Sequence, residues 1–205
     1  MPMLDYMQAK RLLDKYGIRS IDGRYVGAAG DAVAFSKGKG IVLKLISDKA
    51  VHKSKEGLVK LDLRGKEEIT SAFNYLVRKG ERLRPYKILA QKMSGGGVEV
   101  IIGGSTDKQF GRMLLVGLGG IYVETFRDVE LRLCPINKDD AKEMLLDLRS
   151  SGAITYKGVA TEMLASLMVK VSRLLIENEG VDELDLNPVI VREDSYDVVD
   201  IRIIR

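Results

Sequence analysis

The C-terminal segment, ELDLNPVIVREDSYDVVDIRII at residues 183–204, constrains the fold more than any other part of the chain. Apolar and polar residues alternate on both sides of Arg192–Ser195, a pattern that predicts two strands joined by a tight turn. Side chains alternate between the two faces of a strand, so one face of this hairpin is apolar and can pack into a core. The residues on that face are Leu184, Leu186, Val199, Ile201 and Ile203.

The other face of the hairpin carries polar side chains in opposed pairs. A turn at residues 192–195 places Asn187 opposite Asp200 and Asp185 opposite Arg202. Opposed side chains lie roughly 5 Å apart at Cβ, so an amide oxygen and a carboxylate can bind one cation together. A small set of oxygen ligands suits Mg²⁺, which takes its other ligands from water and phosphates. A solvated face with a weak Asp185–Arg202 ion pair explains the same pattern, and the spacing alone favours that alternative.

The rest of the chain predicts a mixture of helices and strands. Helical periodicity is clearest between Asp5, a candidate N-cap, and Gly17, a candidate C-cap. Further helices are predicted at residues 66–79 and after Asn137 and Thr161. No internal repeat or long linker interrupts this order, so we expect an α+β chain of two lobes.

Glycine clusters separate the predicted strands in the middle of the chain. Strands are predicted at residues 41–46, 86–93, 98–102, 113–116 and 121–124. The last four fit two antiparallel hairpins, joined by SGGG at residues 94–97 and GLGG at residues 117–120. Glycine lets backbone amides approach a phosphate, although a plain turn explains both clusters equally well. Neither cluster matches a Walker A loop or a dinucleotide-binding fingerprint.

Composition argues against several classes of protein. The 33 Lys and Arg residues are interspersed with 29 Asp and Glu residues, giving a net charge of +4 without a basic block, which argues against nucleic-acid binding. Cys134 is the only cysteine and His52 the only histidine, so an internal disulfide and a cysteine–histidine zinc site are excluded. No apolar run is long enough to cross a membrane and no leader pattern is present, so we expect a soluble cytoplasmic protein.

Two basic residues stand out by their position. Lys44 is the only polar residue within residues 41–46, where its charge requires an anionic partner. His52 follows in the loop VHKSKEGLVK, and a neutral imidazole is a competent nucleophile near pH 7. Lys53 and Lys55 would offset the charge that the ring gains on accepting a phosphoryl group. An exposed histidine in a basic surface loop is the alternative, and composition alone favours it.

Several stretches, taken in order, carry a family resemblance: LLDKYGI, IVLKLISDKAVHKS, GVEVIIGGSTDKQFG, VGLGGIYVE, DVELRLCPI, and ELDLNPVIV followed by VDIRI. Together they resemble the beta chain of ADP-forming acetyl-CoA synthetases, relatives of succinyl-CoA synthetase with an ATP-grasp fold. The resemblance covers nearly the whole chain and implies an α+β ATP-grasp fold with nucleotide bound between two lobes. We expect the first lobe, with the N-terminal helix and the phosphohistidine loop, at residues 1–93, and the second at residues 94–205.

The resemblance implies a nucleotide site for ATP or ADP. Lys44 would contact the phosphates, and Glu99 would lie in the nucleotide pocket. Gln91, Lys92 and Met93 would form the hinge against adenine. Lys92 departs from the family pattern, because this hinge position is commonly acidic.

The resemblance also implies a site of phosphoryl transfer. His52 would be the phosphohistidine of the beta chain, and Asp185 would lie close to the phosphoryl group. Gly119, Gly120 and Arg132 would form part of the wall on the phosphate side. The residues after His52, SKEGLV, depart from the usual acidic residue and two glycines.

The mechanism implied is a relay between two subunits. In an alpha subunit that carries the CoA-binding and ligase domains, acyl-CoA and phosphate give an acyl phosphate, and a histidine there takes the phosphoryl group. His52 then carries it to ADP, with Mg²⁺ held by Asn187 and Asp200 and with Lys44 neutralising charge. We expect an α2β2 hetero-oligomer. One alternative is another ATP-grasp carboxylate ligase, which would not need His52, and a second is a nucleotide-sensing subunit without turnover.

Overall fold

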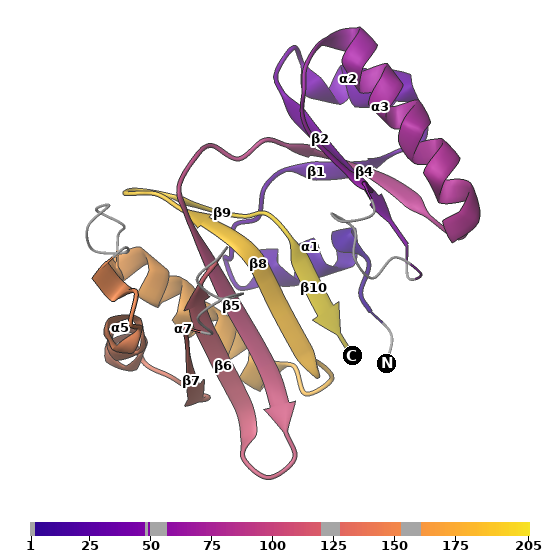
Figure 1. Ribbon diagram of the computed structural model, residues 1–205. Coiled ribbons are helices and arrows are strands. Elements are labelled where there is room, and N and C mark those ends of the chain that lie inside the picture. The colour runs from indigo at the N-terminus through magenta and orange to yellow at the C-terminus, as the bar shows by residue number, and fades with distance from the viewer. Residues whose placement is uncertain (1–2, 48, 50–56, 120–127, 153–160) are drawn as a thin grey trace. The chain divides into compact units, whose positions relative to one another are not determined.

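The chain divides after Ser20 and after Met93 into two units, which the computed structural model describes over residues 3–47, 49, 57–119, 128–152 and 161–205 (Figure 1). The smaller unit is Ile21–Met93, and the larger unit combines Met1–Ser20 with Ser94–Arg205. Each unit has its own antiparallel sheet and its own hydrophobic core. Within the described residues, no helix has the length and apolar character needed to span a bilayer.

The smaller unit is a four-stranded sheet with helices packed on one face (Figure 1). The strand order is β1-β4-β2-β3, and all neighbouring strands are antiparallel. Side chains from the helices and from alternate strand positions share one core. The strands are β1 (Gly23–Val26), β2 (Ile41–Ile46), β3 (Val59–Leu63) and β4 (Lys87–Lys92), and the helices are α2 (Ala29–Ser36), α3 (Gly65–Gly80) and the short η1 (Glu81–Leu83).

Helix α3 confirms the prediction for residues 66–79, since it spans Gly65–Gly80. Ile69, Phe73 and Leu76 are buried because their spacing places them on the one stripe that faces the sheet. Acidic residues in the first turn and basic residues in the last turn complement the helix dipole. The predicted strand at residues 41–46 is β2.

The larger unit is a six-stranded sheet with the order β10-β8-β5-β6-β7, in which β9 lies beside β8. Three helices contribute buried side chains to a single core with alternate residues of the strands. In Figure 1 two of these helices pass behind the strands and the third, labelled α5, lies at the left. The strands are β5 (Val98–Asp107), β6 (Gly111–Leu118), β7 (Val129–Leu133), β8 (Glu183–Val191), β9 (Tyr196–Val198) and β10 (Ile201–Ile204), and the helices are α1 (Tyr6–Lys15), α5 (Lys138–Asp147) and α7 (Thr161–Glu177).

The predicted caps at the starts of two helices are confirmed. At the start of α1, the Asp5 carboxylate accepts hydrogen bonds from the Met7 and Gln8 amides. At the start of α5, the Asn137 side-chain oxygen accepts hydrogen bonds from the Asp139 and Asp140 amides. Each cap forms a reciprocal capping box, which satisfies amides that have no partner within the helix. Caps of this kind are local in sequence, which is why the sequence predicts them well.

The register predicted for the terminal hairpin is confirmed. Arg202 pairs with Asp185 across β10 and β8, and the Arg192 amide donates to the Ser195 carbonyl over 2.8 Å in the turn. One core position differs, because Val198 is fully buried whereas Val199 is only partly buried. Residues 199–200 lie outside both strands, so the alternation of inward and outward side chains restarts there.

Two other predictions about chain pairing are corrected. Strand β4 does not form a hairpin with β5, but pairs with β1 and β2 in the smaller sheet, because the SGGG cluster leads from one unit to the other. Helix α1 was placed with residues 21–93, whereas it packs on the larger unit beside β10. Residues 121–124, predicted as a strand, lie outside the described residues, and β6 pairs with β5 and β7.

We predict that the glycines of the SGGG cluster differ in their tolerance of a methyl group. A Cβ at Gly97 would lie 2.6 Å from the backbone oxygen of Val191, whereas a Cβ at Gly96 would meet nothing within 4 Å. Gly97→Ala should therefore lower the free energy of unfolding by about 1–3 kcal/mol, because backbone cannot move aside cheaply. Gly96→Ala is the matched control and should change it by less than about 0.5 kcal/mol. Urea unfolding of both variants checks this, and equal stabilities would contradict it.

Candidate active site

Lys44 lies on the face of the smaller sheet that points away from the helices. Its neighbours in the strand, Leu43 and Leu45, belong to the core between sheet and helices, so alternation turns Lys44 to the other side. The side chain is nevertheless only 6% exposed. A buried ammonium is stable only when oppositely charged or polar groups compensate for its lost hydration.

The three predicted hinge residues are divided between the two faces of the smaller sheet. Gln91 pairs with Val42 and shares the face of Lys44, where its side chain is buried. Lys92 projects to the opposite face, and its ammonium lies 2.5 Å from the Asp22 carboxylate. Met93, the last residue of the smaller unit, is 38% exposed. Of the three, only Gln91 directs its side chain to the face that carries Lys44.

In the larger sheet, Asp185 and Glu99 share the face that points away from the helices. Leu184 and Leu186 are in the helix-side core, so Asp185 between them faces the other way. Glu99 precedes Val100, another helix-side core residue, and therefore lies on the same face as Asp185. The sheet thus presents two of the predicted acidic site residues on one face.

Gly119 is held directly against Glu99. Its amide donates a hydrogen bond to the Glu99 carbonyl over 2.7 Å. A Cβ at this position would lie 2.8 Å from the Glu99 Cβ, so the close approach requires glycine. Two other predicted residues, Gly120 and His52, lie outside the described residues.

The electrostatic environment of Asp185 favours the binding of a cation. Burial raises the pKa of Asp185 above its ordinary value, Arg202 opposes that shift, and the carboxylates of Asp200 and Glu183 add to it. A carboxylate that is partly buried beside two others is destabilised in its charged form. A cation beside Asp185 would relieve this repulsion.

Asn187 and Asp200 lie opposite each other in the terminal hairpin. The Asn187 amide donates to the Asp200 carbonyl over 3.3 Å, which confirms that the two residues are opposed. Among the described residues, no group of three or more His, Cys, Asp or Glu side chains is placed to hold a metal ion alone. One amide and one or two carboxylates fit Mg²⁺, which retains waters and takes phosphate oxygens as further ligands.

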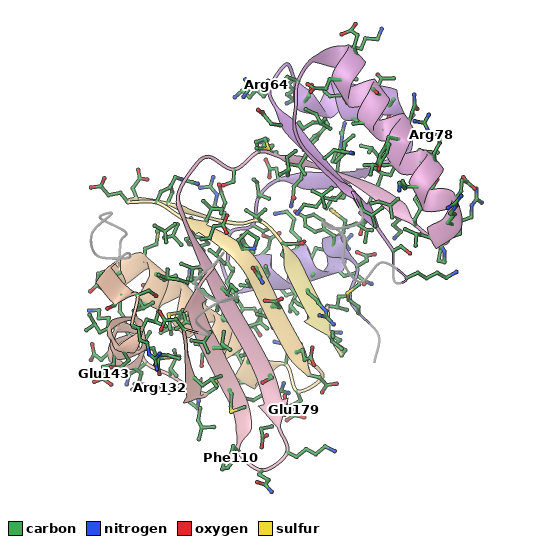
Figure 2. The ribbon with its side chains drawn as sticks, viewed as in Figure 1. Arg64, Arg78, Phe110, Arg132, Glu143 and Glu179 are labelled. Atoms are coloured by element: carbon green, nitrogen blue, oxygen red, sulfur yellow. The ribbon has the colours of Figure 1, made fainter. Side chains whose placement is uncertain are left out.

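Arg132 lies on the opposite face of the larger sheet. It pairs with Leu114, whose side chain is in the helix-side core. Its guanidinium is 3.0 Å from the Glu143 carboxylate and 3.4 Å from that of Asp140, both on α5, as Figure 2 shows for Glu143. The hydrogen bond to Glu143 raises the pKa of Arg132. The structure therefore ties β7 to α5 through Arg132 and does not bring it to the face of Asp185.

Sequence reasoning missed a hydrogen-bonded group where the chain enters the larger unit. The Ser94 hydroxyl donates to the Asp197 carboxylate over 2.9 Å, and the Arg192 guanidinium donates to the same oxygen over 2.7 Å. At the other crossing, Ser20 forms a β-bridge with Val198. Strand β9 therefore anchors both crossings of the chain. The sequence gives no signal for this, because polar residues beside a turn are also typical of a solvated surface.

Comparisons with known proteins show the family to which the chain belongs. A family model described as ATP-grasp domain matches residues 2–204. The chain is 36% identical to the acetate–CoA ligase [ADP-forming] I subunit beta of Pyrococcus furiosus, over 96% of this chain and 89% of that one. It is 38% identical to acetate–CoA ligase [ADP-forming] I of Archaeoglobus fulgidus, over 94% of this chain but only 30% of that one.

Solved structures include a similar chain with ligands. It is the dinucleotide-forming acetyl-coenzyme A synthetase 1 of Ca. Korarchaeum cryptofilum, in complex with coenzyme A and Mg-AMPPCP, with its phosphohistidine segment pointing towards the nucleotide binding site. The two chains are 36% identical and superpose with a TM-score of 0.85, covering 98% of this chain and 92% of that one.

We predict that Asp185→Asn stabilises the chain in a pH-dependent way. The raised pKa of Asp185 means that folding disfavours its carboxylate, so this group's contribution to stability falls as pH rises from the ordinary Asp value through the raised one. The variant should therefore have a higher Tm than wild type at pH 7 without metal, and the difference should vanish below about pH 4. Calorimetry across this range checks it.

Glu193→Gln is the control for this prediction, since it removes one charge from the exposed turn of the same hairpin. It should not reproduce the pH-dependent gain. A lower Tm for Asp185→Asn at pH 7 would contradict the account, because it would mean that the carboxylate stabilises the fold without a cation.

Proposed function

Because the chain belongs to the ATP-grasp family, and within it to the beta subunits of ADP-forming acetate–CoA ligases, we propose that it is the nucleotide-binding subunit of such an acid–thiol ligase. The reaction converts acyl-CoA, ADP and phosphate into the acid, ATP and CoA, and it is reversible. The observation that carries this proposal is the register of the terminal hairpin. It puts Asp185 on the face that also carries Glu99 and sets Asn187 opposite Asp200.

The chemistry assigned to this chain is the transfer of one phosphoryl group. A phosphohistidine of the partner subunit passes its phosphoryl group to His52, and His52 passes it on to ADP. In the second step the P–N bond to the imidazole breaks as a bond forms to the terminal oxygen of the ADP β-phosphate, and the ring, which carries a proton on its other nitrogen, leaves as neutral imidazole. The phosphohistidine segment of the Korarchaeum enzyme, which points towards its nucleotide site, supports this role for His52.

The described residues would hold and orient the nucleotide. Lys44 would contact its phosphates and Gln91 the adenine edge, and Glu99 and Gly119 would be its contacts from residues 94–205. When bound, Mg²⁺ neutralises charge on the phosphates and fixes their orientation. Asn187 and Asp200 would supply its protein ligands, and Asp185 would lie beside the transferring group. Arg132 would act only by holding β7 on α5.

The reaction requires a partner subunit. The chain spans about nine-tenths of the Pyrococcus beta subunit, and the name of that relative implies an alpha subunit. In the Archaeoglobus relative, the matching segment is only 30% of a longer chain, whose remainder has room for further domains. We propose that a separate alpha subunit supplies the CoA-binding and ligase domains in a cytoplasmic α2β2 assembly.

A second candidate function is that of another ATP-grasp carboxylate ligase, which forms an acyl phosphate directly from ATP. It would use Lys44, Asn187 and Asp200 in the same way. A subunit that only senses nucleotide would use them for binding without turnover. His52 separates these functions, because only the relay requires a side chain that is itself phosphorylated.

We predict that His52→Ala abolishes phosphoryl transfer to ADP and leaves nucleotide binding nearly unchanged. Loss of the nucleophile should lower the rate by at least about 10³-fold, as in other enzymes with covalent intermediates. The measurement is acid-labile phosphate on the chain after the complex is incubated with acetyl phosphate, together with calorimetry of Mg·ADP binding. Full activity of the variant would favour the direct carboxylate ligase instead.

We also predict that the purified chain alone binds Mg·ADP but does not turn over acyl-CoA. The reason is that the steps on CoA and the acyl group are assigned to the partner. Coupled assays for ATP formation with and without the alpha subunit check this. Robust turnover by the chain alone would show that the division of labour between the subunits is wrong.

A further inference from the structure

The smaller unit contains a pocket of about 550 Å³ at the end of the sheet where β1 and β2 begin and β4 ends. The C-terminal end of α2 closes one side of it. Its size lies within the range of sites that bind small molecules. Five charged side chains line it, namely Asp22, Arg24, Lys37, Lys39 and Lys92.

This pocket lies on the opposite face of the sheet from the proposed nucleotide contacts. Arg24 pairs with Ala90, and Lys92 pairs with Ile41. Ala90 and Ile41 belong to the core between sheet and helices, so Arg24 and Lys92 project to the helix side. Lys44 projects to the other side, and the pocket is therefore separate from the site described above.

The pocket carries an excess of positive charge. Among the described residues that line it, Asp22 is the only acidic one, and its carboxylate lies 2.5 Å from the Lys92 ammonium. The Arg24 guanidinium lies 5.3 Å from the centre of the Phe35 ring and donates to the backbone oxygen of Asp31. Neither contact neutralises the positive charge of Arg24. Within the described part of the chain, Lys37 and Lys39 form no ion pair. A concave surface lined by one sign of charge concentrates counter-ions.

The backbone at Lys37 has a conformation that is unusual for lysine. Lys37 follows α2 as its C-cap with φ 47°, in the left-handed region where glycine or asparagine is usual, and Gly38 with φ 76° comes next. The partial negative charge at the C-terminal end of α2 amounts to about half of one charge. It therefore does not balance the positive charges of Arg24, Lys37 and Lys39.

We propose that this pocket binds a small, multiply charged phosphate anion, with Lys37, Lys39 and Arg24 as its charged contacts. The ligand chemistry is a diphosphate group, either as inorganic pyrophosphate or as part of a nucleotide. Binding there is independent of the proposed catalytic function, since none of these three side chains belongs to the nucleotide or metal site.

The test uses the full chain with Lys44→Met, so that the proposed nucleotide site is weakened, in buffer without divalent metal. Pyrophosphate is titrated by calorimetry and by amide NMR. We expect saturable binding that shifts the Gly38 and Gly40 amide signals. Lys37→Gln with Lys39→Gln should weaken it by at least about tenfold, because two charge-assisted contacts are lost. ADP in place of pyrophosphate tests whether the diphosphate group is also accepted within a nucleotide.

Two further variants separate binding from general effects. Lys66→Gln with Lys108→Gln removes the same charge from exposed positions outside the pocket and should leave the affinity unchanged. Lys37→Gly relieves the left-handed conformation, so it should weaken binding while keeping or raising Tm. Absence of pyrophosphate binding, equal weakening in both double variants, or shifts confined to residues around Gln91 would each overturn the proposal.

Discussion

The register of the terminal hairpin is the constraint on which the candidate site depends. Burial of Leu184, Leu186 and Ile203 in the helix-side core fixes which face of β8 and β10 points away from the helices. A slip of one residue would exchange the two faces and bury the polar residues in place of the apolar ones. The core thereby determines that Asp185 lies on the same face as Glu99.

Strand β9 of the same hairpin contacts the residues at which the chain leaves and re-enters the larger unit. The carboxylate of Asp197 receives hydrogen bonds from Ser94 and Arg192, and Val198 forms a bridge with Ser20. The two crossings are thus fixed to β9, only a few residues from Asp200. In the smaller unit, Asp22 and Lys92, which lie next to the two crossings, form an ion pair. The charge of Lys92 therefore has a partner in Asp22.

The sequence predicted well those features that depend on residues close together in the chain. Alternation predicted the hairpin register, and cap residues predicted the starts of α1 and α5. The pairing of β4 was not predictable in this way. It depends on which strands, distant in sequence, share a hydrophobic core with β4. The position of Arg132 on the helix side of its sheet was not predictable for a similar reason. A signal was present in Asp140 and Glu143, whose spacing puts two carboxylates on one helix face, but only the fold places that face beside β7.

The most direct test of this account is a crystal structure of the chain with Mg²⁺ and a non-hydrolysable nucleotide. We predict that the ion lies about 2.1 Å from side-chain oxygens of both Asn187 and Asp200, with phosphate and water oxygens completing its shell. An ion coordinated elsewhere, with those two side chains directed away from it, would contradict the claim that the hairpin register builds the site.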